Sequence, residues 1–503
     1  MNYNRASGVL LHPTSLPGSY GIGDLGPQAH RWLDFLAEAG CSLWQVLPLG
    51  PTGYGDSPYH CFSAFAGNPY LISPEKLLEE GLLDPIDLEN LPDFPTDHVD
   101  FGWLIPWKSN LLDRAYDHFL TNSSRRLTND FKEFQSIQAA WLDDFVLFMA
   151  LKEAHGGDPW SSWSKPLLAR SPDALDKLRK EMAESIQRQM FRQFIFFRQW
   201  IDLRTHAHKR NIKIIGDIPI FVAHDSADVW ANLDLFYMDD KGHPTVVAGV
   251  PPDYFSPTGQ LWGNPLYRWD VHAATGYVWW LERFRAVLSL VDIIRLDHFR
   301  GFSAYWEVPA GNPTAEIGQW VPGPGKDLLT AVQIGLGDLP IIAEDLGVIT
   351  PDVVEMRDIF NLPGMKILQF SFSSTPDDPF LPHNYPVNCV AYTGTHDNDT
   401  VLGWYESLTR KERSFCLRYL PSDGQDLPWD MVRAIWRSMA MLSLAPMQDL
   451  LSLGTGARMN FPGRPSGNWT WRMPEDSLTD ELCERLHDLN YLYSRLNHDT
   501  LHL

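Results

Sequence analysis

Short apolar runs that alternate with helix-like segments recur along the chain. The first run lies at 8–12, and the segment that begins at Gly26-Pro27 carries apolar residues such as Trp32 and Phe35 at helical spacing until Gly40. A second apolar run follows at 42–50. This order of strand, helix and strand indicates a parallel sheet with helices packed outside it.

Six further runs of the same kind appear much later in the chain. They lie at 212–222, 292–299, 340–347, 365–371, 388–397 and 442–451. Together with the first two they make the eight strands that a (β/α)₈ barrel requires, although other α/β sheets use the same elements. We therefore expect an α/β fold, a (β/α)₈ TIM barrel with large inserted, mainly helical subdomains.

Two gaps between the predicted strands are too long for ordinary connections. The first, at about 60–210, has mostly helical periodicity, and we interpret it as a helical insertion. The second, at about 223–290, contains the Pro- and Gly-rich run 248–267, whose composition argues against regular structure and favours a lid loop over the active face. Both would belong to a single catalytic domain that spans 1–503.

Charge and composition exclude several classes of partner. The 503 residues carry a formal net charge of −22, which argues against nucleic acid and anionic membrane, since both bind basic surfaces. No apolar run is long enough to span a bilayer, and the first residues lack a signal-peptide pattern. The five cysteines are widely spaced without a CxxC pair, so neither disulfides nor zinc are indicated. A cytoplasmic protein is expected; its oligomeric state stays open.

Acidic residues gather where four of the predicted strands end. The clusters are Gly216-Asp217 with the later His224-Asp225, 295–298, Glu344-Asp345 and 395–399. Because the carboxyl ends of parallel barrel strands open on one face, these side chains are expected to converge there. A single Asp of this kind is as well explained by helix capping, but four clusters on one face indicate an active site.

Two carboxyl groups in different protonation states are what glycoside cleavage requires. Arg295 and Asp297 lie on the same side of a strand, so the guanidinium would keep Asp297 ionised, as a nucleophile needs. Glu344 follows an apolar run and would serve as the acid if its surroundings raise its pKa. Asp397, beside His396, would hold sugar hydroxyls and favour the positive charge of the transition state.

A metal site is the main competing interpretation of the same residues. The run 396–399 contains ligand types, but it lacks the helical HExxH spacing and the twelve-residue calcium loop. Neither a GxGxxG turn nor a P-loop follows a predicted strand. We therefore expect neither a metal nor a cofactor.

Four of these segments resemble, in order, the conserved regions of the α-amylase superfamily: GDIPIFVAHDSAD, IIRLDHFRGF, IIAEDLG and YTGTHDN. Three more are similar to the amylomaltases, the 4-α-glucanotransferases or disproportionating enzymes: GVLLHPTSLPGSYGIGDLG, WQVLPLGPTGYGDSPYHCFSAFAGNPYLI and PPDYFSPTGQLWGNPLY. The resemblance covers nearly the whole chain. It implies that Asp297 is the nucleophile, Glu344 the acid/base and Asp397 the transition-state stabiliser, supported by Arg295 and His396.

The same resemblance implies a set of glucan-binding residues. Tyr254, Phe255 and Trp262 would belong to a loop that folds over bound glucan. Tyr59 would line the donor site, and Tyr54 would belong to a secondary glucan-binding groove.

Asp217 would line the donor site together with Tyr59. Near the end of the chain, GARMNFPGRPSGNWTWRM resembles the last conserved loop of the family, in which Asn460 and Asn468 would contact sugar. Asn and Trp in a Gly/Pro loop are as often turn and packing residues, and that interpretation stays open.

The implied activity is transfer of a segment of an α-1,4-glucan to the 4-hydroxyl of another glucan or of glucose, with retention. This route requires the two reacting carboxyl groups to be about 5 to 5.5 Å apart. α-1,4-Glucans and maltooligosaccharides would be the binding partners. The alternatives are an α-amylase-like hydrolase that admits water and a non-catalytic glucan-binding protein; the three intact carboxylates argue against the second.

Overall fold

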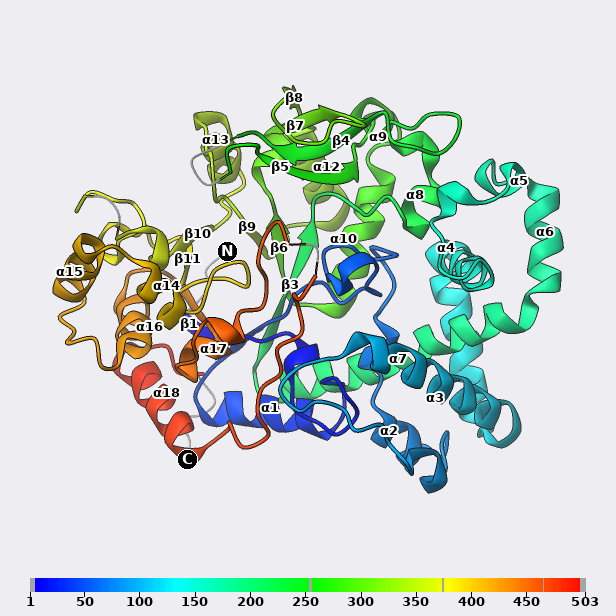
Figure 1. Ribbon diagram of the computed structural model, residues 1–503, viewed down its shortest axis with the longest axis horizontal. Coiled ribbons are helices and arrows are strands. Elements are labelled where there is room, and N and C mark those ends of the chain that lie inside the picture. The colour runs from blue at the N-terminus through cyan, green and yellow to red at the C-terminus, as the bar shows by residue number, and fades with distance from the viewer. Residues whose placement is uncertain (1–4, 253–255, 373–374, 465, 498–503) are drawn as a thin grey trace.

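The computed structural model describes residues 5–252, 256–372, 375–464 and 466–497. Eight parallel strands form a sheet that is almost closed into a barrel (Figure 1), in the order β10-β11-β12-β1-β2-β3-β6-β9. Their bounds are β1 (Ala6–Leu10), β2 (Leu43–Gln45), β3 (Lys213–Pro219), β6 (Ile293–Asp297), β9 (Ile341–Ala343), β10 (Gly364–Ile367), β11 (Cys389–Tyr392) and β12 (Leu442–Pro446). All eight predicted strands are confirmed, and so is the (β/α)₈ barrel.

The seam of the barrel lies between β9 and β10. In the described chain these two strands share no ladder of paired residues. Instead, the amide of Ala343 donates to Pro363 O at 2.9 Å, and the amide of Met365 donates to the Asp345 carboxylate at 2.7 Å. A side-chain carboxylate therefore replaces part of a strand ladder.

Buried apolar side chains fill the barrel on both sides of its strands. β11 and β12 are buried along their whole length, because one face meets the barrel interior and the other meets helices. The interior layers are formed by Leu43, Ile215, Ile293, Ile342, Met365, Ile367, Val390, Tyr392, Met441, Leu442 and Leu444. This packed interior leaves the loops at the strand ends as the place for a site.

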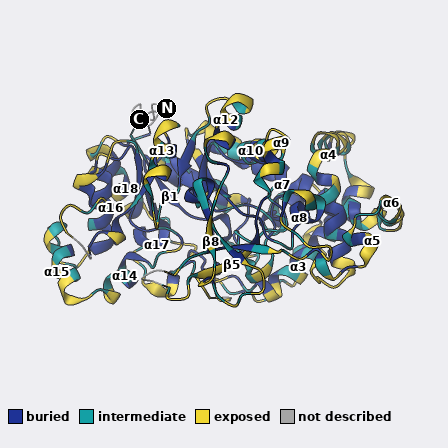
Figure 2. Cartoon of the chain, turned by 90° about the horizontal axis from the view of Figure 1, so that it is seen from above, coloured by how far each residue is buried: buried dark blue, intermediate teal, exposed yellow. Residues whose placement is uncertain are grey.

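Helices surround the barrel, with exposed residues on their outer faces and in the loops between them (Figure 2). α1 (Pro27–Glu38) begins and ends as predicted, with Pro27 in its first turn and Gly40 in a left-handed conformation after its end. The other long helices after β3 are α10 (Val278–Leu290), α12 (Gly325–Leu336), α15 (Arg410–Tyr419), α16 (Leu427–Arg437) and α18 (Asp480–Leu492), with the shorter α13 (Pro351–Ile359).

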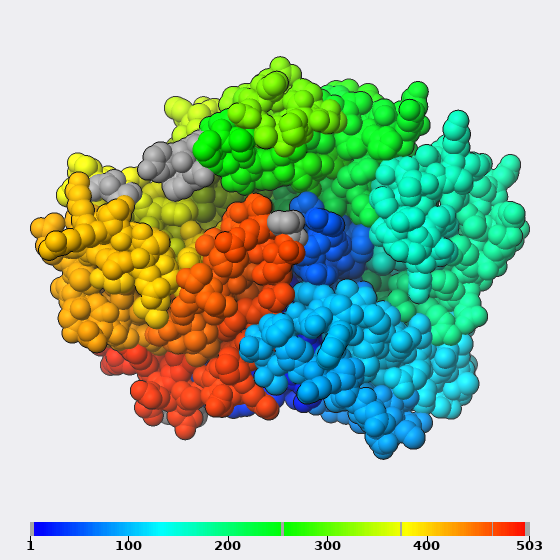
Figure 3. All heavy atoms as spheres, in the orientation of Figure 1, coloured from blue at the N-terminus to red at the C-terminus, as the bar shows by residue number. Residues whose placement is uncertain are grey.

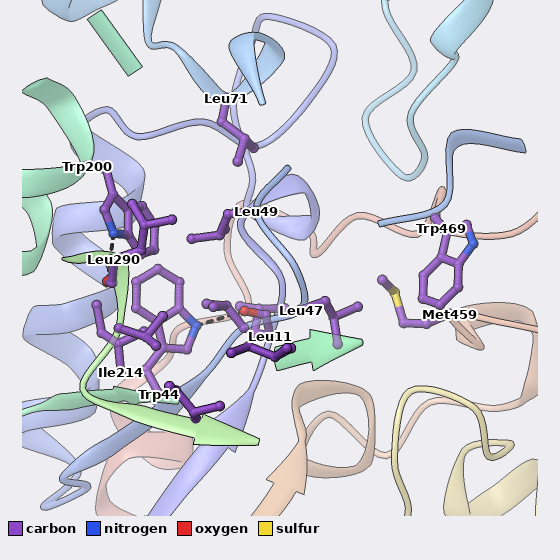
Figure 4. Packing of buried hydrophobic residues seen from close by; sticks show 14 of the residues in the cluster. Leu11, Trp44, Leu47, Leu49, Leu71, Trp200, Ile214, Leu290, Met459 and Trp469 are labelled. Atoms are coloured by element: carbon purple, nitrogen blue, oxygen red, sulfur yellow. Dashed lines mark hydrogen bonds between the residues drawn. The ribbon is translucent and has the colours of Figure 1, made fainter. Parts of the chain in front are cut away.

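A helical layer lies between β2 and β3 in sequence and to the right of the barrel in Figure 1. It consists of α2 (Pro74–Glu79), α3 (Phe101–Asn122), α4 (Arg125–Ala154), α5 (Lys165–Leu168), α6 (Pro172–Glu181) and α7 (Ala183–Lys209). Trp200 of α7 packs beside Trp44 of β2, and the two indoles donate to Leu290 O and Leu11 O (Figure 4). These contacts join the helical layer to the barrel core.

A second, antiparallel sheet lies beside the barrel, in the order β5-β4-β7-β8. It contains β4 (Val246–Val250), β5 (Gln260–Pro265), β7 (Ala304–Pro309) and β8 (Gln319–Pro322). The expectation that the run 248–267 lacks regular structure is therefore wrong. β5 lies at the edge of the sheet, where no further strand needs a hydrogen bond from Pro265. β4 ends at Val250, before Pro251. The prolines are therefore compatible with both strands.

Within the part of the chain described, no helix is both long and apolar enough to cross a membrane. The cysteines at positions 41, 61, 389, 416 and 483 are all free thiols.

Candidate active site

The predicted site residues come from loops at the carboxyl ends of the barrel strands. In Figure 3 the surface is hollowed where the blue residues that follow β2, the orange-red residues near 460 and the green residues after β3 meet. The side chains that converge here belong to segments far apart in sequence. Their geometry is described strand by strand below.

Arg295 forms the centre of the site. Its Nε and Nη2 donate to the two carboxylate oxygens of Asp217 at 2.8 and 2.6 Å, and Nη2 also donates to Asp297 Oδ1 at 3.0 Å. Asp217 is brought there because β3 and β6 pair in register, with Asp217 opposite Arg295. The predicted placement of Arg295 and Asp297 on one side of a strand is confirmed.

Tyr59 completes this charged group from the loop after β2. Its hydroxyl donates to Asp217 Oδ2 at 2.6 Å, and its ring stacks on His396 with 5.1 Å between centroids. Burial, reinforced by the negative charge of Asp217, raises the pKa of the Tyr59 phenol well above its usual value. The phenol therefore stays protonated and works as a hydrogen-bond donor.

Glu344 follows β9, the strand beside β6. Its Oε2 accepts from the His298 amide at 2.7 Å, and its Oε1 accepts from the Leu346 amide at 3.0 Å. His298 directly follows Asp297 and has a left-handed backbone, with φ of 51°. The pairing of β6 with β9 thus places Asp297 and Glu344 side by side.

Burial raises the pKa of both of these carboxyl groups above that of an exposed acid. Burial raises the pKa of Asp297 to about 6, against the opposing effect of Arg295. Burial, together with the charge of Asp297, raises the pKa of Glu344 well above its usual value. Because Arg295 contacts Asp297 directly, Asp297 ionises first and Glu344 keeps the proton.

Asp397 lies across the site on the loop after β11, with its side chain 51% exposed. Asn460 Nδ2 donates to Asp397 Oδ1 at 2.7 Å, whereas His396 Nε2 is 3.4 Å from Asp397 Oδ2. Burial lowers the pKa of His396, so its ring is neutral. His396 Nδ1 is buried and has no hydrogen-bond partner in the described chain.

Trp262 borders the site beside His298. Its ring meets His298 edge-on, with 4.8 Å between centroids. Tyr254 and Phe255, predicted in the same lid loop, lie outside the described residues. Tyr54 is 80% exposed, consistent with a place outside the central group.

Three of the acidic or polar residues singled out from the sequence have partners elsewhere. Asp225 pairs with Lys152 at 2.5 Å, and Asp345 forms part of the barrel seam. Asn468 is buried: its Oδ1 accepts from the Phe461 amide at 2.9 Å and its Nδ2 donates to a carbonyl of the same loop at 3.0 Å. These bonds are those of a turn residue, one of the two interpretations that the sequence left open.

The structure adds two residues that the sequence did not single out. Arg458 donates to Asp397 O at 2.7 Å, and Trp469 packs against both Tyr59 and His396, with centroids 5.8 and 5.9 Å away. Both lie in a loop without periodic pattern, so only their closeness in sequence to Asn460 pointed to them. No group of three or more His, Cys, Asp or Glu in the described chain is arranged to hold a metal ion.

Known proteins are similar to this chain in sequence and in fold. The profile of the 4-alpha-glucanotransferase family, a glycoside hydrolase family, matches residues 11–479. The chain is 52% identical to a 4-alpha-glucanotransferase of Thermus thermophilus, over 99% of this chain and 100% of the relative, and 50% identical to one of Synechocystis sp., over 98% of each. The solved structure of an amylomaltase from Streptococcus agalactiae in complex with acarbose superposes with a TM-score of 0.95 at 39% identity, covering 98% of this chain and all of that one. The chain therefore belongs to the 4-alpha-glucanotransferase family.

Proposed function

We propose that this 4-α-glucanotransferase transfers a segment of an α-1,4-glucan to the 4-hydroxyl of a second glucan or of glucose, with Asp297 as nucleophile and Glu344 as acid/base. One observation supports this assignment above the others. Asp297 lies 3.0 Å from Arg295 while its neighbour Glu344 is buried with a raised pKa, so the pair holds one charge and one proton. These are the two states that retaining glycoside chemistry needs.

In the first half of the reaction, a carboxylate oxygen of Asp297 forms a bond to the anomeric carbon while the bond from that carbon to the leaving O4 breaks. The proton of Glu344 moves to this oxygen, and the shortened glucan departs. The product is a β-linked glycosyl-enzyme. The carboxylate left on Glu344 accepts from the amides of His298 and Leu346, which stabilises its new charge.

In the second half, Glu344 acts as base. It takes the proton from the 4-hydroxyl of the acceptor as that oxygen attacks the anomeric carbon and Asp297 leaves. The α configuration is restored because two inversions follow each other. Water in place of the acceptor would give hydrolysis, which is the alternative outcome of the same residues.

Asp397, His396 and Tyr59 hold the reacting sugar in this proposal. Asp397 is fixed through Asn460 on one carboxylate oxygen, so its other oxygen is free to accept from sugar hydroxyls. His396 Nε2, 3.4 Å from Asp397 Oδ2, provides one more polar group. Hydrogen bonds from these residues that strengthen as the sugar ring distorts would stabilise the transition state more than the bound substrate.

The acceptor side of the site is proposed to contain Trp262, Tyr254 and Phe255, whose rings would stack on sugars and limit the access of water. Asn460 and Asn468 would contact sugar from the loop on the opposite side, and Asn460 also reaches the site through Asp397. Tyr54, being exposed, would bind a more distant part of a long glucan.

The division of the chain remains a proposal as well. A single catalytic domain would span 1–503, with a helical insertion at about 60–210 and a second insertion at about 223–290 that carries the lid loop. Five free thiols are in keeping with a reducing compartment, and we propose the cytoplasm.

A trapping experiment tests the assignment of the nucleophile. In Glu344→Gln, α-maltotriosyl fluoride still reacts, because fluoride leaves without a proton, but the second step lacks its base. We expect a maltotriosyl ester to accumulate on the peptide that contains Asp297, measured by mass spectrometry after rapid acid quenching and peptic digestion. An ester on another residue, or release of fluoride without any ester, would contradict the assignment.

A further inference from the structure

We propose that Arg458 is a positioning residue that sets the orientation of Asp397 by tying two active-site loops together. The inference rests on the proposed role of Asp397 as the group that stabilises the transition state. Arg458 itself lies outside the reacting group and acts through Asp397.

The side chain of Arg458 spans the gap between the loop after β11 and the loop after β12. Nη2 donates to the carbonyl oxygen of Asp397 and Nε donates to the carbonyl oxygen of Asn460, both at 2.7 Å. The two carbonyls belong to the same two residues whose side chains meet at 2.7 Å, Asn460 Nδ2 to Asp397 Oδ1. One planar guanidinium therefore fixes the separation of the two backbones that carry this contact.

The side chain of Asp397 needs such support, because the bond from its amide to Thr395 Oγ1 at 3.3 Å holds the backbone alone. The side chain is half exposed, and within the described residues its carboxylate has, apart from Asn460, only the 3.4 Å approach of His396. The carboxylate is thus free to rotate unless the Asn460 amide stays in place. Misplacement of a reacting group by about 1 Å costs on the order of a hundredfold in rate.

Other contacts hold the ends of this loop and its internal turn, in which Asn398 Oδ1 accepts from the Thr395 amide and hydroxyl, both at 2.9 Å. Asp449 accepts from Thr393 Oγ1 at 2.6 Å and from the Val401 amide at 2.8 Å, one residue on each side of the loop. Thr455 Oγ1 donates to Asp399 Oδ2 at 3.0 Å. Of the side chains in the described chain, Arg458 and Asn460 are those that reach Asp397 from the opposite loop.

Arg464 provides a matched control. The guanidinium groups of both arginines lie over the Phe461 ring, 4.6 Å from its centroid for Arg458 and 4.2 Å for Arg464. Both arginines therefore pack on the same ring in the same loop. Only Arg458 also bonds to Asp397 and Asn460.

The first experiment measures kcat and KM with maltotriose. We expect Arg458→Ala to lower kcat by roughly ten- to a hundredfold while KM for maltotriose changes by less than about threefold, because the lost interaction acts in the transition state. Arg458→Lys, which keeps the charge but bridges fewer carbonyls, should retain an intermediate kcat and guards against a misfolded alanine variant. Arg464→Ala should leave kcat unchanged. An unchanged kcat in Arg458→Ala, or an equal loss in Arg464→Ala, would overturn the proposal.

A double-mutant cycle then asks whether Arg458 acts through Asp397. Fluoride release from α-maltotriosyl fluoride is measured for the wild type, Arg458→Ala, Asp397→Ala and the double variant. We expect the Arg458 substitution to have no further effect once Asp397 is alanine. The same fold loss in both backgrounds would refute the inference about Arg458, whereas full activity in Asp397→Ala would refute the proposed function instead.

Discussion

The backbone amide of His298 donates a 2.7 Å hydrogen bond to the carboxylate of Glu344. His298 directly follows Asp297, so one strand end supplies both the proposed nucleophile and a ligand for the acid/base. Burial keeps Glu344 protonated before the reaction, and the hydrogen bond from this amide stabilises the carboxylate that forms afterwards. The two roles of Glu344 are thus served by opposing effects at a single carboxyl group.

Loss of the nucleophile should abolish turnover without unfolding the protein. We expect Asp297→Asn to lower kcat with maltotriose by at least about 10³-fold, since a variant without its nucleophile retains only binding and electrostatic effects. Asp292→Asn is the matched control at the other end of the same strand, where Asp292 accepts from the Ile214 amide at 2.9 Å. It should lower Tm and leave kcat unchanged. A kcat in Asp297→Asn near that of the wild type would be incompatible with the account.

The dependence of kcat/KM on pH should be bell-shaped. Activity falls on the acid side as Asp297, with a pKa raised by burial to about 6, becomes protonated. It falls on the alkaline side as Glu344 loses its proton, at a pH well above the usual range of a glutamic acid. With α-maltotriosyl fluoride as donor, whose leaving group needs no proton, the wild type should keep the acid limb of the single-turnover fluoride release and lose the alkaline limb. An alkaline limb that persists would assign it to another group.

The raised pKa of Glu344 also predicts a dependence of stability on pH. The folded state binds this proton more tightly than the unfolded state, so the stabilisation is complete below the unfolded pKa and is lost as pH rises through the folded pKa. Glu344→Gln cannot lose a proton here. Its Tm relative to that of the wild type should therefore increase from pH 4 to pH 8, as measured by calorimetry. A difference that is constant or shrinks over this range would show that burial does not raise this pKa.

The aromatic border of the site should control the ratio of transfer to hydrolysis. Trp262 lies 4.8 Å from His298, on the side where an acceptor would approach Glu344. Trp262→Ala should weaken acceptor binding by about 1 kcal/mol and raise the share of hydrolysis roughly fivefold, whereas Trp262→Phe should have a smaller effect. The ratio is obtained from new reducing ends and glucose released from maltotriose. Equal ratios in the two variants would exclude a stacking role for the indole.

Much of the barrel was predictable because its strands are apolar on both faces. Runs such as 388–397 and 442–451 stand out from helices by their length and by the turn residues around them, and the structure places strands within both. The second sheet escaped prediction for the opposite reason. β5 combines Gly263, with φ of 78°, and Pro265 at a sheet edge, and such composition looks like a loop until its antiparallel partner β4 is known.

The sequence predicts those parts of the site that depend on single strands and their ends. The Arg295–Asp297 contact follows from alternation along one strand. The pairing of Asp217 with Arg295 depends on the register of two strands distant in sequence, and the bonds of Arg458 depend on the path of a loop. No periodic pattern records either of them, so the sequence indicated Asp217 as a strand-end carboxylate without showing its partner, and it did not single out Arg458.

Incubation of the purified protein with maltotriose alone tests the central claim most directly. The products are separated by chromatography, and glucose and reducing ends are assayed separately. The account predicts glucose together with a ladder of longer maltooligosaccharides and no net rise in reducing ends, because each broken bond is rebuilt on another glucan. Glucose and maltose with a matching rise in reducing ends, and no longer products, would show a hydrolase and contradict the account.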